Sequence, residues 1–186
     1  MGNTKEKHLL FVCTGNTCRS PMAEAIFRYE SHRRGLNVSV SSAGTDAVEQ
    51  GGMHFNSLRT LVNHGLSIEN FSPTKLTDEL LKHACAVVCM TETQKDKLLA
   101  YAQGGMQELA EKIYAFSDFC GVSIPDPYGQ PIDAYENTYL ALEGGMSAMI
   151  DKLFAENPIE KKPKTSAKKK TTGAQECDPI TAEETK

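Results

Sequence analysis

The sequence predicts an α/β fold with a parallel sheet, and three observations support that prediction. Short apolar segments of strand length alternate with longer amphipathic segments, which is the pattern of βαβ units. The first apolar segment, residues 8–13, leads through a short glycine-containing loop into the start of a helix. With 186 residues, of which 40% are hydrophobic, the chain is long enough for one domain with its own core.

Local signals predict each element in turn. Residues 8–13 (HLLFVC) form an apolar run typical of a buried strand. Ser20 should cap the next helix, with Pro21 in its first turn, and this helix should end near Gly35. Thr77 is followed by two acidic residues and should cap a short helix. Further strands are expected at 37–41, 84–90 and 112–116, and further helices at about 54–65, 93–101 and 132–154.

The composition changes after Asn157, which divides the chain into a folded domain, residues 1–157, and a C-terminal tail, residues 158–186. The tail holds seven lysines and almost no large apolar residue. It cannot bury enough surface to fold, so we expect it to be disordered. Such a tail is usually a solvated appendage, although a lysine-rich segment can also touch anionic partners.

Charge and cysteine usage bear on partners and compartment. The net charge of -4 does not favour nucleic acid, and the longest apolar run, residues 84–90, is far too short to span a membrane. None of the six cysteines forms a Cys-x-x-Cys pair, and no histidine pair has zinc-site spacing. We therefore expect a cytoplasmic protein with reduced thiols, in which Cys85 and Cys89 are buried in the apolar run. For the oligomeric state, which no sequence motif specifies, we expect a monomer.

The loop at residues 13–20, between the first strand and the first helix, carries the residues that point to chemistry. A loop wrapped at a helix N-terminus directs several backbone N–H groups at one point and can bind a phosphate dianion. Gly15 would allow the backbone to turn tightly and approach the ligand. The planar guanidinium of Arg19 can bind two phosphoryl oxygens. The same electrostatic field favours the thiolate of Cys13, which could attack phosphorus directly.

Two more side chains of this loop, and a distant loop, complete the predicted site. Ser20 could donate a hydrogen bond to the Cys13 thiolate, and Asn16 could brace the loop through its amide. Asp126 lies between two prolines after the fourth predicted strand, at the carboxyl edge of the sheet where open α/β folds bind ligands. We expect Asp126 to act as general acid and then as general base, with Tyr128 as a wall of the site.

At these residues the chain resembles the low-molecular-weight protein-tyrosine-phosphatase family, and within it the bacterial protein-arginine phosphatases. The resemblance covers about residues 8–155 and rests on the Cys13–Ser20 loop, Pro21–Glu24, Ser41–Thr45 and Asp126–Gly129. It implies a single three-layer domain whose four-stranded parallel sheet has helices on both faces and a phosphate-binding loop after the first strand. It also implies a cysteinyl-phosphate intermediate, phosphorylated protein substrates, and no metal or other cofactor. On the family pattern, the catalytic residues would be Cys13, Arg19 and Asp126, and the phosphate- or substrate-binding residues would be Thr14, Gly15, Asn16, Thr17, Cys18, Ser20 and Tyr128.

The resemblance also implies a redox role for Cys18. A reversible disulfide with Cys13 would protect the nucleophile from over-oxidation. The alternative is that Cys18 is only a small buried residue of the loop.

Thr17 bears on the substrate. Tyrosine-selective members usually carry an aliphatic residue at this position, whereas Thr17 resembles the arginine phosphatases. A threonine supplies a hydroxyl near the leaving nitrogen, and a placed polar group can discriminate strongly. Asp46 at the mouth would favour a cationic guanidinium, although a solvated loop residue is its simpler interpretation. Residues 45–53 contain no aromatic of the kind that many members place beside the substrate. We therefore expect phosphoarginine in preference to phosphotyrosine.

Two other functions compete with this one. Thioredoxin-coupled arsenate reductases share the fold and the loop but need two further cysteines in a mobile segment after the third strand, and residues 91–99 contain none. A non-catalytic phosphate-binding module would be expected to lose the nucleophile or the acid, whereas Cys13 and Asp126 are both present. Both alternatives are therefore disfavoured.

Overall fold

Four short strands alternate with helical segments along residues 7–154, which are the residues that the computed structural model describes. In chain order the elements are β1 (Lys7–Cys13), α1 (Arg19–Arg34), β2 (Val38–Gly44), α2 (Phe55–Asn63), α3 (Asp78–His83), β3 (Ala86–Cys89), α4 (Glu92–Gln103), the 3-10 helix η1 (Gln107–Lys112), β4 (Ile113–Ala115), α5 (Ser117–Cys120) and α6 (Ile132–Phe154).

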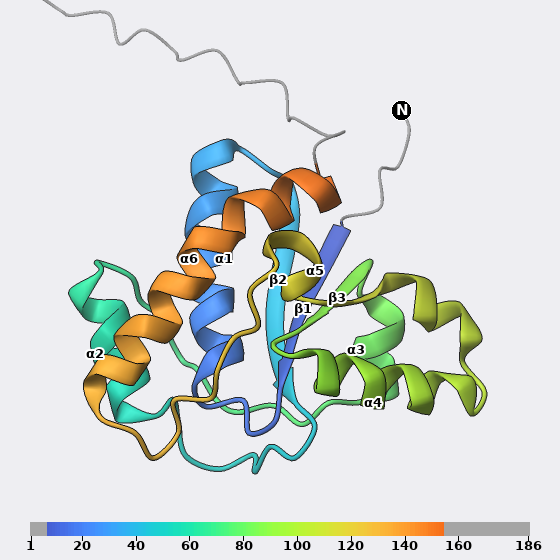
Figure 1. Cartoon of the computed structure of the whole chain (residues 1–186), viewed down its shortest axis with the longest axis horizontal. Helices are drawn as coiled ribbons and strands as arrows, with labels where there is room; N and C mark the ends of the chain where they lie inside the picture. The colour runs from blue at the N-terminus through green and yellow to red at the C-terminus, as the bar shows by residue number, and fades with distance from the viewer. Residues whose placement is uncertain (1–6, 155–186) are drawn as a thin grey trace, which may run out of the picture.

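The four strands are parallel and lie in the order β2-β1-β3-β4. β1 pairs with β2 along its whole length, from Lys7 opposite Val38 to Cys13 opposite Gly44. Helices α1, α2 and α6 cover one face of the sheet, and α3 and α4 cover the other (Figure 1), which confirms the expected three-layer fold. Because all strands run the same way, their carboxyl ends meet at one edge, where the following loops can form a single site.

Side chains of β1 alternate between two apolar cores, one on each face of the sheet. Leu9, Phe11 and Cys13 belong to the core that α1 and α6 cover. Leu10 and Val12 belong to the core that α3 and α4 cover. Because both faces of this strand are buried, its sequence is a continuous apolar run rather than an alternation of apolar and polar residues.

Helix α1 begins before Ser20. Its first residue is Arg19, and Cys18 occupies the cap position without a side-chain capping bond. The expectation that Ser20 caps this helix is therefore wrong, because the Ser20 hydroxyl is turned inward, 2.9 Å from the sulfur of Cys13. At the other end, Gly35 adopts a left-handed φ of 68° and ends the helix as expected.

Strand β3 is shorter than the apolar run 84–90 that contains it. Cys89 is fully buried, and burial raises the pKa of its thiol to about 12. Cys85 precedes the strand and is exposed, so the expectation that it is buried is wrong. The N–H of Cys85 donates to the carbonyl of His8, near the amino end of β1. Cys85 therefore lies at the edge of the sheet opposite the carboxyl ends of the strands.

The sequence does not predict two short elements, η1 and α5, which flank β4. The tail at 158–186 lies outside the described residues, so its disorder stays a prediction. None of the described helices is long and apolar enough to cross a membrane.

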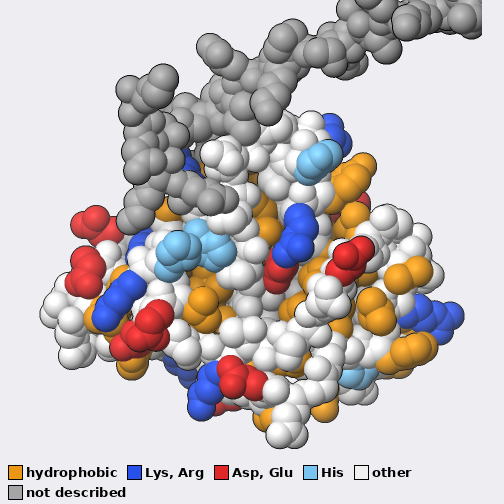
Figure 2. Space-filling model, turned by 180° about the vertical axis from the view of Figure 1, so that it is seen from behind, with side chains coloured by type: hydrophobic (Ala, Val, Ile, Leu, Met, Phe, Trp, Pro, Cys, Tyr) orange, Lys and Arg blue, Asp and Glu red, His pale blue; other side chains and the backbone are white. Residues whose placement is uncertain are grey.

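Helix α2 turns part of its apolar side outward. Ser57 and Thr60 are buried, whereas Phe55, Leu58 and Val62 are 71%, 41% and 60% exposed. Hydrophobic side chains are accordingly visible on the side of the molecule that carries α2, on the right in Figure 2. An apolar stripe at this spacing normally marks the buried face of a helix, so periodicity alone would orient α2 wrongly.

Gly145 of α6 allows close approach to the segment around α5. An added Cβ would lie 2.5 Å from the Phe116 ring and 2.8 Å from the Cys120 sulfur. We expect Gly145→Ala to lower the free energy of unfolding by about 1–3 kcal/mol through overpacking, as measured by urea denaturation.

The neighbouring Gly144→Ala is the matched control. Nothing lies within 4 Å of a Cβ at Gly144, and alanine has a helix propensity better than that of glycine by about 1 kcal/mol. The control should therefore be neutral or stabilising. Equal destabilisation by both substitutions would contradict the packing argument.

Candidate active site

A pocket of about 340 Å³ opens at the carboxyl edge of the sheet, next to the loop that joins β1 to α1. Eight of the ten predicted site residues line it, while Asn16 and Ser20 are fully buried. The complete lining is Cys13, Thr14, Gly15, Thr17, Cys18, Arg19, Asp46, Val48, Gln50, Asp126 and Tyr128.

The carbonyl groups of the loop bond outward to neighbouring segments. A trans peptide unit points its carbonyl and the next N–H in opposite directions, and no peptide bond among the described residues is cis. The N–H groups of Thr14, Gly15 and Cys18 are therefore turned inward, and all three residues line the pocket. The bonds that anchor the carbonyls run from the N–H of Thr45 to Cys13 (3.0 Å), of Asp46 to Thr14 (2.9 Å) and of His54 to Thr17 (2.9 Å).

Asn16 braces the loop from the inside. It is fully buried and has a left-handed φ of 52°, which asparagine tolerates better than most other residues. Its Nδ2 donates to Ser20 Oγ and Ser42 Oγ, each at 2.9 Å. Its Oδ1 accepts the N–H of Thr74 at 2.8 Å. One side chain thus ties the loop to α1, to β2 and to the segment before α3.

The Cys13 thiol is 3% exposed and lies among hydrogen-bond donors. Its sulfur is 2.9 Å from Ser20 Oγ and accepts the N–H of Asn16 at 3.2 Å. The Asn16 amide already donates to Ser20 Oγ, so the Ser20 hydroxyl keeps its own hydrogen for another acceptor. The sulfur is a closer acceptor than the Ala43 carbonyl, at 3.5 Å. Negative charge on the sulfur would therefore be stabilised by two donors.

A buried carboxylate, Glu24, ends the chain of bonds that begins at Cys13. Ser42 Oγ donates to Glu24 Oε2 at 2.7 Å, and the Arg28 guanidinium donates to Oε1 at 2.5 Å. Burial raises the pKa of Glu24, and its bonds to Ser42 and Arg28 oppose that rise. Because an ionised Glu24 can only accept, it orients the Ser42 hydroxyl and leaves Ser42 Oγ to accept from Asn16. Glu24 and Ser42 belong to segments that carry the family resemblance, but the sequence gives neither of them a role in the site, because the chain places them outside the loop that holds the nucleophile.

The Arg19 guanidinium forms an ion pair with Asp126, between Nη2 and Oδ2. The Arg19 side chain is 6% exposed and that of Asp126 is 50% exposed, so the pair lies where the pocket meets solvent. Asp126 Oδ1 also accepts the N–H of Tyr128 at 3.2 Å. The loop before α6 is therefore held against the loop after β1, although the two residues are 107 positions apart.

His54, which the sequence marks only as a helix start, supports one wall of the pocket. Its N–H donates to the Thr17 carbonyl at 2.9 Å. Its ring stacks on Tyr135 with centroids 5.1 Å apart and meets Tyr128 edge-on at 5.7 Å. The histidine therefore links the loop after β1 to α6 and to the exposed ring of Tyr128.

Gly44, rather than Gly15, is the glycine that the packing of the loop requires. The φ of Gly15 is not left-handed, and an added Cβ would meet only Thr17 Oγ1, at 3.7 Å. Gly15 therefore needs no left-handed conformation, and the left-handed residue of the loop is Asn16. A Cβ on Gly44 would clash with the Thr14 carbonyl oxygen and lie 2.9 Å from the Asn16 nitrogen.

The outer wall of the pocket comes from the loop after β2. Asp46, Val48 and Gln50 contribute it, and Val48 is 70% exposed. The Asp46 carboxylate accepts the Thr45 hydroxyl at 2.9 Å through Oδ2. A carboxylate is therefore available at the mouth of the pocket.

Cys18 lines the pocket but is 4% exposed. Burial raises the pKa of its thiol, which lowers its reactivity at neutral pH. The thiols of Cys13 and Cys18 are both free in the structure, and a reversible disulfide between them stays a prediction.

Comparison with known proteins places this chain in a family. The family model described as low molecular weight phosphotyrosine protein phosphatase matches residues 8–160. The chain belongs to this family. The low molecular weight phosphatase is 37% identical over 138 residues to a protein-arginine-phosphatase of Bacillus subtilis (strain 168), a match that covers 73% of this chain and 89% of that protein.

Two further relatives of this phosphatase span most of the domain. It is 32% identical over 144 residues to the low molecular weight protein-tyrosine-phosphatase Etp of Escherichia coli (strain K12), covering 77% of this chain and 92% of that protein. A solved structure of YwlE arginine phosphatase, a cysteine-to-serine variant with a phosphorylated active-site serine, matches with a TM-score of 0.72 and 33% identity. That match covers 78% of this chain and 95% of that one. The protein is thus a cysteine-dependent phosphatase with the α/β fold of its structural relatives.

Gly44→Ala should damage phosphatase activity, because the new Cβ would push the Thr14 carbonyl and the Asn16 nitrogen out of place. We expect kcat/KM on a small aryl phosphate to fall about 10²-fold, the effect typical of a 1 Å misplacement.

The control for this substitution is Gly52→Ala, since nothing lies within 4 Å of a Cβ at Gly52. It should leave kcat/KM within a factor of about two. Near-normal activity of a folded Gly44→Ala protein, as judged by circular dichroism, would refute the argument.

Proposed function

We propose that this phosphatase hydrolyses phosphorylated side chains of proteins, and phosphoarginine in preference to phosphotyrosine, through a phospho-Cys13 intermediate. The observation that carries the proposal is that one pocket holds Cys13, Arg19 and Asp126 together. A thiol among donors, a guanidinium and a half-exposed carboxyl are the groups that a double displacement at phosphorus needs.

In the first displacement, the Cys13 sulfur attacks phosphorus and the bond from phosphorus to the leaving atom breaks. Arg19 and the inward loop N–H groups bind the phosphoryl oxygens, with Arg19 giving up its ion pair to Asp126. The Asp126 carboxylate, once released from the ion pair, takes up the proton that the Cys13 thiol gives up on forming its thiolate, and donates it to the leaving nitrogen or oxygen of the substrate.

In the second displacement, water attacks the phosphorus of phospho-Cys13 and the phosphorus–sulfur bond breaks. Asp126 takes the proton of the water, which restores its acid form and completes the cycle. The Ser20 hydroxyl donates to the departing sulfur, in the direction that the Asn16 amide enforces. Ser20 and Asn16 thus act through the position of Cys13 and the stability of its thiolate.

Two features of the pocket support phosphoarginine as the substrate. Thr17 lines the pocket and offers a hydroxyl where a guanidinium nitrogen would leave. Asp46 offers a carboxylate at the mouth, where the remaining guanidinium charge would lie. The 37% identity to a protein-arginine-phosphatase is in keeping with this preference.

Phosphotyrosine is the second candidate, and Tyr128 is the observation that favours it. Its ring lines the pocket and is 67% exposed. An exposed aromatic ring can stack on a phenyl substrate, which adds about 0.5–1.5 kcal/mol beyond buried area.

We also propose that the enzyme acts in the cytoplasm as a monomer, on protein substrates and without a nucleic-acid partner. The free thiols of the described cysteines and the net charge of -4 support this. In this proposal residues 1–157 form the phosphatase domain, and the tail at 158–186 takes no part in the chemistry.

Cys13→Ser tests the proposed nucleophile. We expect kcat on a small aryl phosphate to fall by at least about 10³-fold, because serine is a much weaker nucleophile without a dedicated base. Cys85→Ser is the control, since Cys85 is exposed at the opposite edge of the sheet and should leave kcat unchanged. A Cys13→Ser protein with normal turnover would rule out the covalent intermediate.

Thr17→Ile tests the proposed substrate. We expect the ratio of kcat/KM for a phosphoarginine peptide to that for a matched phosphotyrosine peptide to exceed one and to fall about tenfold or more with the substitution. Thr93→Ile, an exposed threonine of α4 outside the pocket, should leave the ratio unchanged. If the natural protein prefers phosphotyrosine and Thr17→Ile changes little, Thr17 does not select the substrate.

A further inference from the structure

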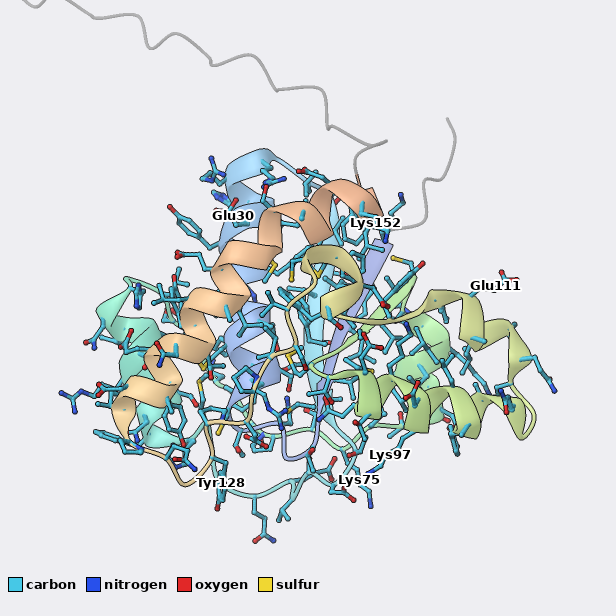
Figure 3. All side chains as sticks on the ribbon, in the orientation of Figure 1. Glu30, Lys75, Lys97, Glu111, Tyr128 and Lys152 are labelled. Carbon is cyan, nitrogen blue, oxygen red and sulfur yellow. The ribbon has the colours of Figure 1, made fainter. Side chains whose placement is uncertain are left out.

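A second hollow adjoins the active-site pocket. It has a volume of about 510 Å³, within the range of ligand-sized sites, and lies between the loop after β2 and helices α3 and α4. Thr14 and Asp46 line both hollows, so the two adjoin on either side of the phosphate loop. In Figure 3, Lys97 marks this groove and Tyr128 marks the active-site pocket, on opposite sides of the loop after β1.

The groove has an apolar floor and a polar rim. Leu76, Leu81 and Leu98 form the floor, and the last two belong to the core beneath the sheet face that α3 and α4 cover. The rim carries carboxylates and the Lys97 ammonium, which takes part in no ion pair among the described residues. Because the rim offers both signs of charge, the floor rather than the charge would select an occupant.

One wall of the groove is closed by Tyr101. This side chain is 53% exposed, and its hydroxyl donates to Asp78 Oδ1 at 2.6 Å. The bond joins α4 to the first turn of α3, the two helices that line this groove. On the other side, Gln94 Nε2 donates to Thr14 Oγ1 at 3.1 Å, so the partition between groove and pocket is also held in place.

We propose that this groove binds the substrate polypeptide beside its phosphorylated residue, with an apolar side chain seated on Leu76 and Leu98. The inference rests on the proposed function, in which the pocket takes one side chain of a protein. An extended chain advances by only about 3.3–3.6 Å per residue, so an adjoining groove is reached by residues close to the modified one. An apolar floor with a polar rim suits a peptide segment, because it buries a side chain while the backbone stays near hydrogen-bonding groups.

The test compares two peptides that carry the same phosphorylated residue, either phosphoarginine or phosphotyrosine, whichever the enzyme hydrolyses faster. One peptide has leucine at the two positions on each side of that residue, and the other has glycine. A small aryl phosphate, which cannot reach the groove, reports the chemistry alone. We expect the natural protein to prefer the leucine peptide by about tenfold in kcat/KM, the discrimination typical of a modest apolar contact.

Tyr101→Ala and Leu76→Ser should each reduce the leucine preference several-fold, measured relative to the small aryl phosphate in the same protein. Tyr29→Ala is the matched control, because Tyr29 is 55% exposed and lies on α1 outside the groove. It should retain the full preference.

The outcomes separate this inference from the proposed function. If the natural protein hydrolyses the small ester and both peptides without preferring leucine, the groove does not bind the substrate and the inference is overturned. The inference is also overturned if Tyr101→Ala and Leu76→Ser both keep the full preference for the leucine peptide. If the natural protein hydrolyses neither the peptides nor the small ester, the proposed function fails and the inference fails with it.

Discussion

The site depends on the buried amide of Asn16, which holds the loop after β1 in a left-handed conformation that few residues adopt. Its Nδ2 and Oδ1 bond to Ser20, Ser42 and Thr74, which lie on three different segments. An unpaired buried polar group costs about 1–3 kcal/mol, so other loop geometries are disfavoured. The position of the Cys13 sulfur, and the donors around it, follow from this one constraint.

The parallel sheet brings residues from other segments of the chain to this loop. Its strands end at the same edge, so segments far apart in the chain meet there without a special connection. Arg19 of α1 and Asp126 before α6 form an ion pair in this way, and His54 joins Thr17 to the aromatic side chains of the opposite wall. The nucleophile and the guanidinium therefore lie at a strand end and a helix start, where side chains are positioned more precisely than on loops, and Asp126 reaches them from a loop.

Chemistry and selectivity are separated in space. The proposed nucleophile is buried and tied into a hydrogen-bond chain that reaches Glu24 and Arg28, whereas the proposed acid Asp126 lies where the pocket meets solvent. The groups proposed to select substrates are more exposed and lie around the mouth, from Tyr128 and Asp46 to the groove beyond Thr14. Substitutions at the mouth can change the preferred substrate without disturbing the packing that positions the nucleophile.

The amino-acid sequence alone was sufficient for the α/β fold, because strand, loop and helix start follow one another in the chain and leave local signals. The same is true of the phosphate loop, in which nucleophile and guanidinium are six positions apart. Contacts between distant segments leave no such spacing, so only the folded chain decided that Gly44 packs against the loop, that Glu24 orients its hydrogen bonds and that Cys85 is exposed. The orientation of helix α2 was also decided only by the tertiary structure. Its exposed apolar stripe has the periodicity of a buried helix face, so packing alone sets which face points inward.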